Sequence, residues 1–116
     1  MEAKEIAVLA AKLITDKKGR NVTILELGNI SILCDYFVIC QGNSRVQTQA
    51  IADYLDEELG KAGIALRRRE GFAEGRWILL DFGEIIVHIF QEEERGFYNL
   101  ERLWGDAPLI NYEKEQ

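Results

Sequence analysis

The apolar residues of the chain change their spacing several times, and these changes predict where helices and strands lie. From Ala3 to Thr15 they recur every three or four residues, which is typical of one buried stripe of a helix, and Gly19 is expected to stop that helix. From Val22 to Ile30 the period is two, which indicates a strand that gives way to a turn. Tyr36–Cys40 is a continuous apolar run and predicts a strand buried on both faces.

The second helix is predicted to begin after Ser44. Gln47 follows three residues later, so the two side chains are placed to form a reciprocal capping box. Gly60 or Gly63 is expected to end this helix. Its buried stripe is expected to consist of Val46, Ala50, Ile51, Tyr54, Leu55 and Leu59.

The last part of the chain is predicted to contain three strands and a helix. Leu66–Arg69 is a weak strand candidate, whereas Trp77–Phe82 and Glu84–Phe90 are expected to form a hairpin that turns at Gly83. A final helix is predicted over Glu92–Trp104, because the glutamates in its first turn favour the positive end of the helix dipole.

This order of elements predicts an α+β fold, with a single mixed β-sheet of about five strands and helices packed mainly on one face. At 116 residues, of which 47% are hydrophobic, the chain has the usual length of one domain. We expect that domain to span residues 1–105 and the C-terminal tail, residues 106–116, to be loosely held.

The two faces of the predicted hairpin differ in chemistry. Side chains alternate across a strand, so one face is uniformly apolar and suits helix packing: Ile78, Leu80, Phe82, Ile85, Val87 and Ile89. The other, which we call the mixed face, carries aromatic, acidic and imidazole groups: Trp77, Leu79, Asp81, Ile86, His88 and Phe90. Burying an unpaired carboxylate costs several kcal/mol, so we expect the mixed face to be covered only in part, or to be covered by another molecule.

Two interpretations of the mixed face stay open. In the first, Asp81 hydrogen-bonds the hairpin turn or pairs with His88, and Trp77 packs under the last helix. In the second, the face binds another protein and Trp77 and Phe90 are its anchors, because tryptophan is favoured at the centres of interfaces. The pattern alone does not choose between them.

The charge of the chain narrows the class of partner. The formal net charge of -6 disfavours a mainly nucleic-acid partner, because such binding depends on Lys and Arg neutralising phosphates. The basic cluster Arg67–Arg69 is interpreted as a solvated strand edge, and direct RNA binding through it and Arg76 is the weakest alternative. No apolar run is long enough to span a membrane and the N-terminus lacks a signal-peptide pattern, so we expect a soluble, cytoplasmic protein.

Residues for catalysis or metal binding are sparse. His88 is the only histidine, and it has neither a nucleophile at a recognisable spacing nor a second ligand to complete a metal site. Cys34 and Cys40 lack CxxC spacing and are expected to be buried, reduced thiols. The sequence therefore predicts no catalytic residues, no metal and no cofactor.

The strongest enzymatic hypothesis starts from the turn Gly42-Asn43-Ser44, where a strand runs into a capped helix. Backbone N–H groups at such a turn can hold a phosphate, and nucleotidyltransferases use a Gly-Ser motif in this setting. These enzymes also need paired carboxylates on one strand face for magnesium, and Asp81 and Glu84 straddle a turn instead. Nucleotide binding or nucleotidyl transfer is therefore the alternative function.

Three motifs together resemble the ribosomal silencing factor family, whose members are also called Iojap-related proteins. They are DYFVICQGNS at Asp35–Ser44, GRWILLDFGEIIVHIF at Gly75–Phe90 and ERGFYNLERLW at Glu94–Trp104. The resemblance extends over roughly Ile6 to Trp104, almost the whole chain, and the chain looks like the bacterial type.

The resemblance implies a non-enzymatic role. Members of this family are expected to bind a basic large-subunit ribosomal protein where the small subunit docks, and so to repress translation under nutrient limitation or in stationary phase. The implied fold looks like a nucleotidyltransferase core without catalytic carboxylates. The implied partner-binding residues are Trp77, Asp81, His88, Phe90, Arg95, Tyr98 and Trp104, while Gly42, Asn43 and Ser44 shape the strand-to-helix turn. Little or no direct nucleic-acid binding and no membrane binding are expected, and an exposed apolar sheet face would also permit a homodimer.

Overall fold

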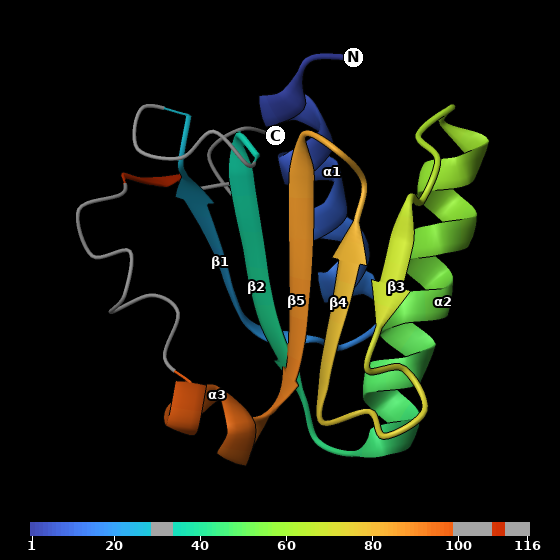
Figure 1. Cartoon of the computed structure of the whole chain (residues 1–116), viewed down its shortest axis with the longest axis vertical. Helices are drawn as coiled ribbons and strands as arrows, with labels where there is room; N and C mark the ends of the chain where they lie inside the picture. Colours follow the sequence, from blue (N-terminus) through green and yellow to red (C-terminus); the bar gives the residue numbers. More distant parts are fainter. Residues whose placement is uncertain (29–33, 99–107, 111–116) are drawn as a thin grey trace.

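The computed structural model describes residues 1–28, 34–98 and 108–110 (Figure 1). Its elements in chain order are α1 (Ala3–Asp16), β1 (Arg20–Glu26), β2 (Tyr36–Gly42), α2 (Arg45–Lys61), β3 (Arg68–Glu70), β4 (Trp77–Asp81), β5 (Ile85–Gln91), α3 (Glu92–Tyr98) and β6 (Leu109–Ile110). The predicted last helix is confirmed as far as Tyr98, and its remaining residues lie outside the described ranges.

One mixed sheet organises these elements, in the order β3-β4-β5-β2-β1-β6. β2 and β5 run parallel at its centre, and every other neighbouring pair is antiparallel. In Figure 1, α1 and α2 lie on one side of this sheet, while α3 sits at the end of β5. The predicted α+β class with one mixed sheet is confirmed.

The predicted C-terminal tail contains a strand. Leu109 and Ile110 form β6 and pair with Leu25 and Ile24 of β1, and the Glu26 N–H donates to the Pro108 carbonyl at 2.9 Å. The sheet therefore has six strands rather than about five, and two residues of the predicted tail, Leu109 and Ile110, belong to it. The pairing joins segments about eighty residues apart, which local sequence patterns cannot reveal.

The apolar face of the hairpin forms the main core, as predicted. All six of its residues are buried together with the inner stripes of α1 and α2: Ile78, Leu80, Phe82, Ile85, Val87 and Ile89. From β2, Val38 and Cys40 join the same core, whereas Ile39 enters a second cluster on the other side of the sheet. The prediction that β2 is buried on both faces is therefore confirmed.

The end of α1 uses Gly19 in an unexpected way. The helix stops at Asp16, and Lys18, not the glycine, adopts the left-handed conformation with φ of 66°. The Gly19 N–H donates to the Ile14 carbonyl at 2.9 Å, and a Cβ at Gly19 would lie 2.3 Å from Cγ2 of Ile14. Gly19 is thus needed for close packing rather than for its backbone freedom.

The start of α2 confirms the predicted cap. The Ser44 hydroxyl accepts from the Gln47 N–H at 3.1 Å, and the Gln47 side chain accepts from the Asn43 N–H at 2.6 Å, one residue before the expected donor.

The predicted buried stripe of α2 is wrong at two positions, because Val46 is 76% exposed and Ala50 is also exposed. Thr48 and Ala52 are buried instead. Thr48 is tolerated there because its hydroxyl donates to the Gly75 carbonyl at 2.7 Å.

The basic cluster lies at a sheet edge, as expected. β3 is the terminal strand next to β4, and all three of its residues are exposed. Arg68 pairs with Glu70 at 3.3 Å, and Arg69 pairs with Asp53 of α2 at 3.2 Å. Within the described residues, no helix is both long and apolar enough to span a membrane.

Gly71, in the loop between β3 and β4, can be tested against Gly60 of α2 as a control glycine. Gly71 has φ of +76°, and a Cβ there would lie 2.1 Å from the Trp77 carbonyl oxygen, so Gly71→Ala is expected to lower the free energy of unfolding by about 1 to 3 kcal/mol. Gly60 of α2 has no heavy atom within 4 Å of a built Cβ, so Gly60→Ala should raise stability by about 0.5 to 1 kcal/mol. Urea unfolding measures both changes, and shifts of the same sign would contradict this description of the loop.

Candidate functional site

Strand register extends the mixed face across the sheet. Residues paired on neighbouring strands point to the same side, so Asp81 and Ile86 share their side with Phe37 of β2 and Leu25 of β1. The same row begins at Arg68 on β3 and ends at Leu109 on β6, which is 68% exposed. An apolar row with charged groups at one end therefore crosses the side of the sheet opposite α1 and α2.

A second core cluster lies on the same side of the sheet as this row and shares Leu25 with it. Its buried members are Leu25, Leu27, Cys34, Ile39 and Phe90, and Phe37, Trp77 and Ile86 pack on it while staying partly exposed. The mixed face thus has an inner apolar layer and an outer, half-exposed layer. Trp77 and Asp81 belong to the half-exposed group.

Two predicted contact residues are covered within the chain itself. Phe90 is 0% exposed and His88 is 4% exposed. The Trp77 ring stacks on Phe90, with ring centroids 5.1 Å apart, and Phe90 belongs to the second core cluster. Phe90 is therefore not an exposed anchor in this structure, which corrects the prediction of an open face at this position.

Trp77 and His88 form a hydrogen-bonded pair across β4 and β5. The indole Nε1–H of Trp77 donates to Nδ1 of His88 at 3.0 Å. Because Nδ1 accepts, the neutral imidazole carries its proton on Nε2, the only buried side-chain polar atom without a hydrogen-bond partner in the part of the chain that is described. Burial lowers the pKa of His88 to about 4, so the ring is neutral near pH 7.

Asp81 follows the first of the two interpretations. Its carboxylate accepts from the Gly83 N–H at 2.8 Å and so fixes the hairpin turn, where Gly83 has φ of +94°. It does not pair with His88, whose Nδ1 is bound to Trp77. Asp81 stays half-exposed and leaves an acidic group at the end of the apolar row.

Arg95 connects α3 to the first two strands. Its guanidinium donates to the Asn21 carbonyl, to the Thr23 hydroxyl at 3.1 Å and to the Gln41 side chain at 3.5 Å. The structure therefore shows Arg95 engaged within the chain, at the β2 end of the mixed face. The Tyr98 side chain and Trp104, also predicted to bind a partner, lie outside the described part of the chain.

Contacts that the sequence did not predict tie the first turns of α2, which follow the turn Gly42-Asn43-Ser44, to neighbouring loops. Gln47 donates to the Lys18 carbonyl at 3.0 Å, and Gln49 donates to the Phe72 carbonyl at 2.7 Å. A Cβ at Gly42 would lie 3.1 Å from Cγ2 of Thr48, so a glycine fits closely here. The run of polar side chains in the first turns of a helix was the available signal for these contacts.

Neither cysteine is in an environment that favours a reactive thiolate. Both thiols are free and buried, as predicted. Burial, followed by the charge of Asp35, raises the pKa of Cys34 to about 11, and burial raises the pKa of Cys40 to about 12. Both thiols are therefore protonated near neutral pH. Among residues 1–28, 34–98 and 108–110, no three His, Cys, Asp or Glu side chains are grouped as metal ligands.

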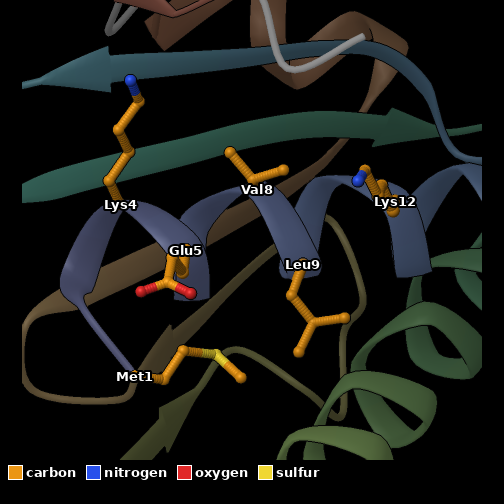
Figure 2. Close-up of a pocket in the computed structure, with 6 residues that line it drawn as sticks. All are labelled: Met1, Lys4, Glu5, Val8, Leu9 and Lys12. Atoms are coloured by element: carbon orange, nitrogen blue, oxygen red, sulfur yellow. The ribbon is translucent and has the colours of Figure 1, made fainter. Parts of the chain in front are cut away.

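A pocket of about 290 Å³ lies away from the mixed face. Figure 2 shows its lining, which comes from Met1 and from α1: Lys4, Glu5, Val8, Leu9 and Lys12. It contains none of the predicted site residues and mixes two lysines with a glutamate, so its charge does not single out one kind of ligand.

Known proteins with similar sequence and structure share one family. The sequence matches the family described as "Ribosomal silencing factor during starvation" over residues 1–116. The ribosomal silencing factor RsfS of Bacillus subtilis is 45% identical over 111 residues, covering 96% of this chain and 94% of that protein. RsfS of Halalkalibacterium halodurans is 44% identical over 113 residues, covering 97% of each.

A crystal structure of a Chromobacterium violaceum protein has the same fold. Its TM-score is 0.88 at 32% sequence identity, and the match covers 90% of this chain and 88% of that one. Matches to a family and to relatives over nearly the full length agree with the three motifs found in the sequence. The chain therefore belongs to the ribosomal silencing factor family.

Proposed function

We propose that the chain binds a basic protein of the large ribosomal subunit through the half-exposed layer of the mixed face, and that its bulk then blocks the small subunit. Repression of translation under nutrient limitation or in stationary phase would follow from the blocked joining. This role needs position and affinity but no catalysis. Since subunits join in the cytoplasm, we expect the chain to act there.

The observation that carries the proposal is the half-exposed apolar layer on a rigid sheet. Phe37, Trp77 and Ile86 pack against the second core cluster, so little conformational freedom is lost when a partner covers them. Asp81 adds an acidic group beside them, and the net charge of -6 would steer the chain toward a basic partner. A standard interface of about 1,600 Å² in total is within reach of one sheet face and an adjoining helix.

The proposed contacts divide into two groups. Trp77 and Asp81 are proposed to touch the partner, with Arg95, Tyr98 and Trp104 at the adjoining end of the surface. His88 and Phe90 are proposed to act from beneath, because they are buried. Nucleotide binding at Gly42–Ser44 is less favoured, since the Gln47 side chain already accepts from the Asn43 N–H that a phosphate would need.

The purified chain is expected to co-sediment with isolated large subunits and to reduce subunit joining measured by light scattering. Trp77→Ala should weaken this binding by roughly 30-fold, about 2 kcal/mol, because truncating a central interface tryptophan costs at least this much. Val46→Ala is the matched control, since Val46 is 76% exposed on α2, an element that packs on the other face. Normal joining at saturating protein would contradict the proposal.

A further inference from the structure

We infer that His88 is a positioning residue, which holds the Trp77 indole so that a partner meets its apolar ring and not its N–H. The inference rests on the proposed function, because it describes how that surface is presented. Nothing in the chain's sequence pattern required it: alternation places Trp77 and His88 on one face, but it does not say that they are bonded.

The geometry turns the polar atom of Trp77 inward. The indole Nε1–H points to Nδ1 of His88 at 3.0 Å, and the indole ring stacks on Phe90 with an interplanar angle of 26°. His88 is itself held by Phe37, whose ring meets the imidazole edge-on at 4.6 Å between centroids. The contacts that orient Trp77 therefore include a directional bond to His88 and a stacked ring, Phe90.

Burying the imidazole of His88 costs stability, and the hydrogen bond to Trp77 is a reason to keep a histidine at this position. Nε2 of His88 has no hydrogen-bond partner among the described residues, and leaving a buried donor unsatisfied costs about 1 to 3 kcal/mol. An apolar side chain would fill the same place without that cost, because the neighbouring residues on its face are apolar or aromatic: Phe37, Ile39, Leu79, Ile86 and Phe90. What an apolar side chain cannot supply is an acceptor for the indole N–H.

The hydrogen bond between Trp77 and His88 limits the kinds of partner group that can interact favourably with Trp77. Since the indole N–H is engaged inside the chain, a hydrogen-bond acceptor on the partner gains nothing from that atom. The outer part of the ring instead suits an aliphatic side chain or the guanidinium or ammonium group of a basic protein. A basic partner would place one Lys or Arg against the aromatic ring and another near Asp81, four residues further along β4.

The hydrogen bond can be tested without any partner. The chain has two tryptophans, so its ¹H–¹⁵N spectrum has two indole N–H signals, and Trp77→Phe identifies the one from Trp77. In the unsubstituted chain this indole proton should exchange slowly with water. His88→Phe keeps a ring but removes the acceptor, so the Trp77 signal should shift and its exchange should speed up. His88→Asn keeps an acceptor near the place of Nδ1 and should preserve slow exchange.

Binding to isolated large subunits then tests the positioning role. His88→Phe is expected to weaken binding about tenfold, the effect of losing one hydrogen bond, whereas His88→Asn should stay within about threefold of the unsubstituted chain. His88→Leu serves as a second variant without an acceptor, and thermal melts establish which variants fold.

The exchange and binding measurements distinguish the positioning role of His88 from the proposed binding to large subunits. Fast exchange of the Trp77 indole proton in the unsubstituted chain overturns the inference whatever the variants do. So does a folded His88→Phe or His88→Leu chain that binds large subunits as tightly as the unsubstituted one. If the unsubstituted chain shows slow exchange but does not bind large subunits, the proposed function fails, and with it the role assigned to His88, while the hydrogen bond itself is supported.

Discussion

Replacing Phe90 with alanine is expected to lower the free energy of unfolding by about 3 to 5 kcal/mol, the range for truncating a large buried aromatic residue. Phe90 is fully buried, belongs to the second core cluster and supports the stacked ring of Trp77. Its loss would leave a cavity on the side of the sheet opposite α1 and α2, where the neighbouring strands cannot readily move inward because they are hydrogen-bonded to one another.

Urea unfolding at pH 7 measures this loss, and Val46→Ala provides the control. Val46 is 76% exposed, so its truncation should change stability by no more than about 0.5 kcal/mol. A loss below about 1 kcal/mol for Phe90→Ala would show that the second cluster is not a packed core. In that case Trp77 would lack the rigid support on which the proposed binding surface depends.

Lowering the pH from 7 to 4 is expected to remove about 3 kcal/mol of stability through His88 alone, and about 2 kcal/mol of this by pH 5. Burial lowers the pKa of His88 from 6.5 to about 4. Between these two values the unfolded chain binds a proton that the folded chain excludes. The contribution of His88 is therefore fully present above pH 6.5 and is lost as the pH falls toward 4.

The comparison with His88→Asn isolates this effect from the titration of carboxylates. Asparagine does not ionise, so the unfolding free energy of the unsubstituted chain, relative to that of His88→Asn, should fall steadily from pH 7 to pH 4. Carboxylates contribute to both chains and cancel in that difference. Parallel pH profiles for the two chains would mean that His88 is accessible to protons in the folded chain.

Local patterns predicted the parts of the fold that depend on neighbouring residues. Ser44 caps α2 because its hydroxyl reaches an N–H three residues away, and period-two alternation assigned all six apolar hairpin residues to the main core. Both signals lie within a few residues of the structure that they specify. The class of the fold followed from the order of such elements.

The structural features that the sequence did not predict depend on contacts between segments far apart in the chain. Thr48 is buried because it meets the Gly75 carbonyl, and β6 exists because β1 offers it an edge. Neither fact is visible in the spacing around Thr48 or Leu109. Alternation likewise placed Trp77, His88 and Phe90 on one face, but the depth of each side chain depends on how the second cluster packs. The candidate site could therefore be located from sequence, while its division into buried and half-exposed layers could not.

The two outer strands have a consequence for behaviour at high concentration. An open sheet ends in strands with unpaired backbone donors and acceptors, and such strands can recruit further chains into fibrils. Here one margin is β3, three residues long and fully charged, and the other is β6, only two residues long. Short margins, and on β3 only charged side chains, discourage the pairing of one copy beside the next, so the chain is expected to stay dispersed at high concentration.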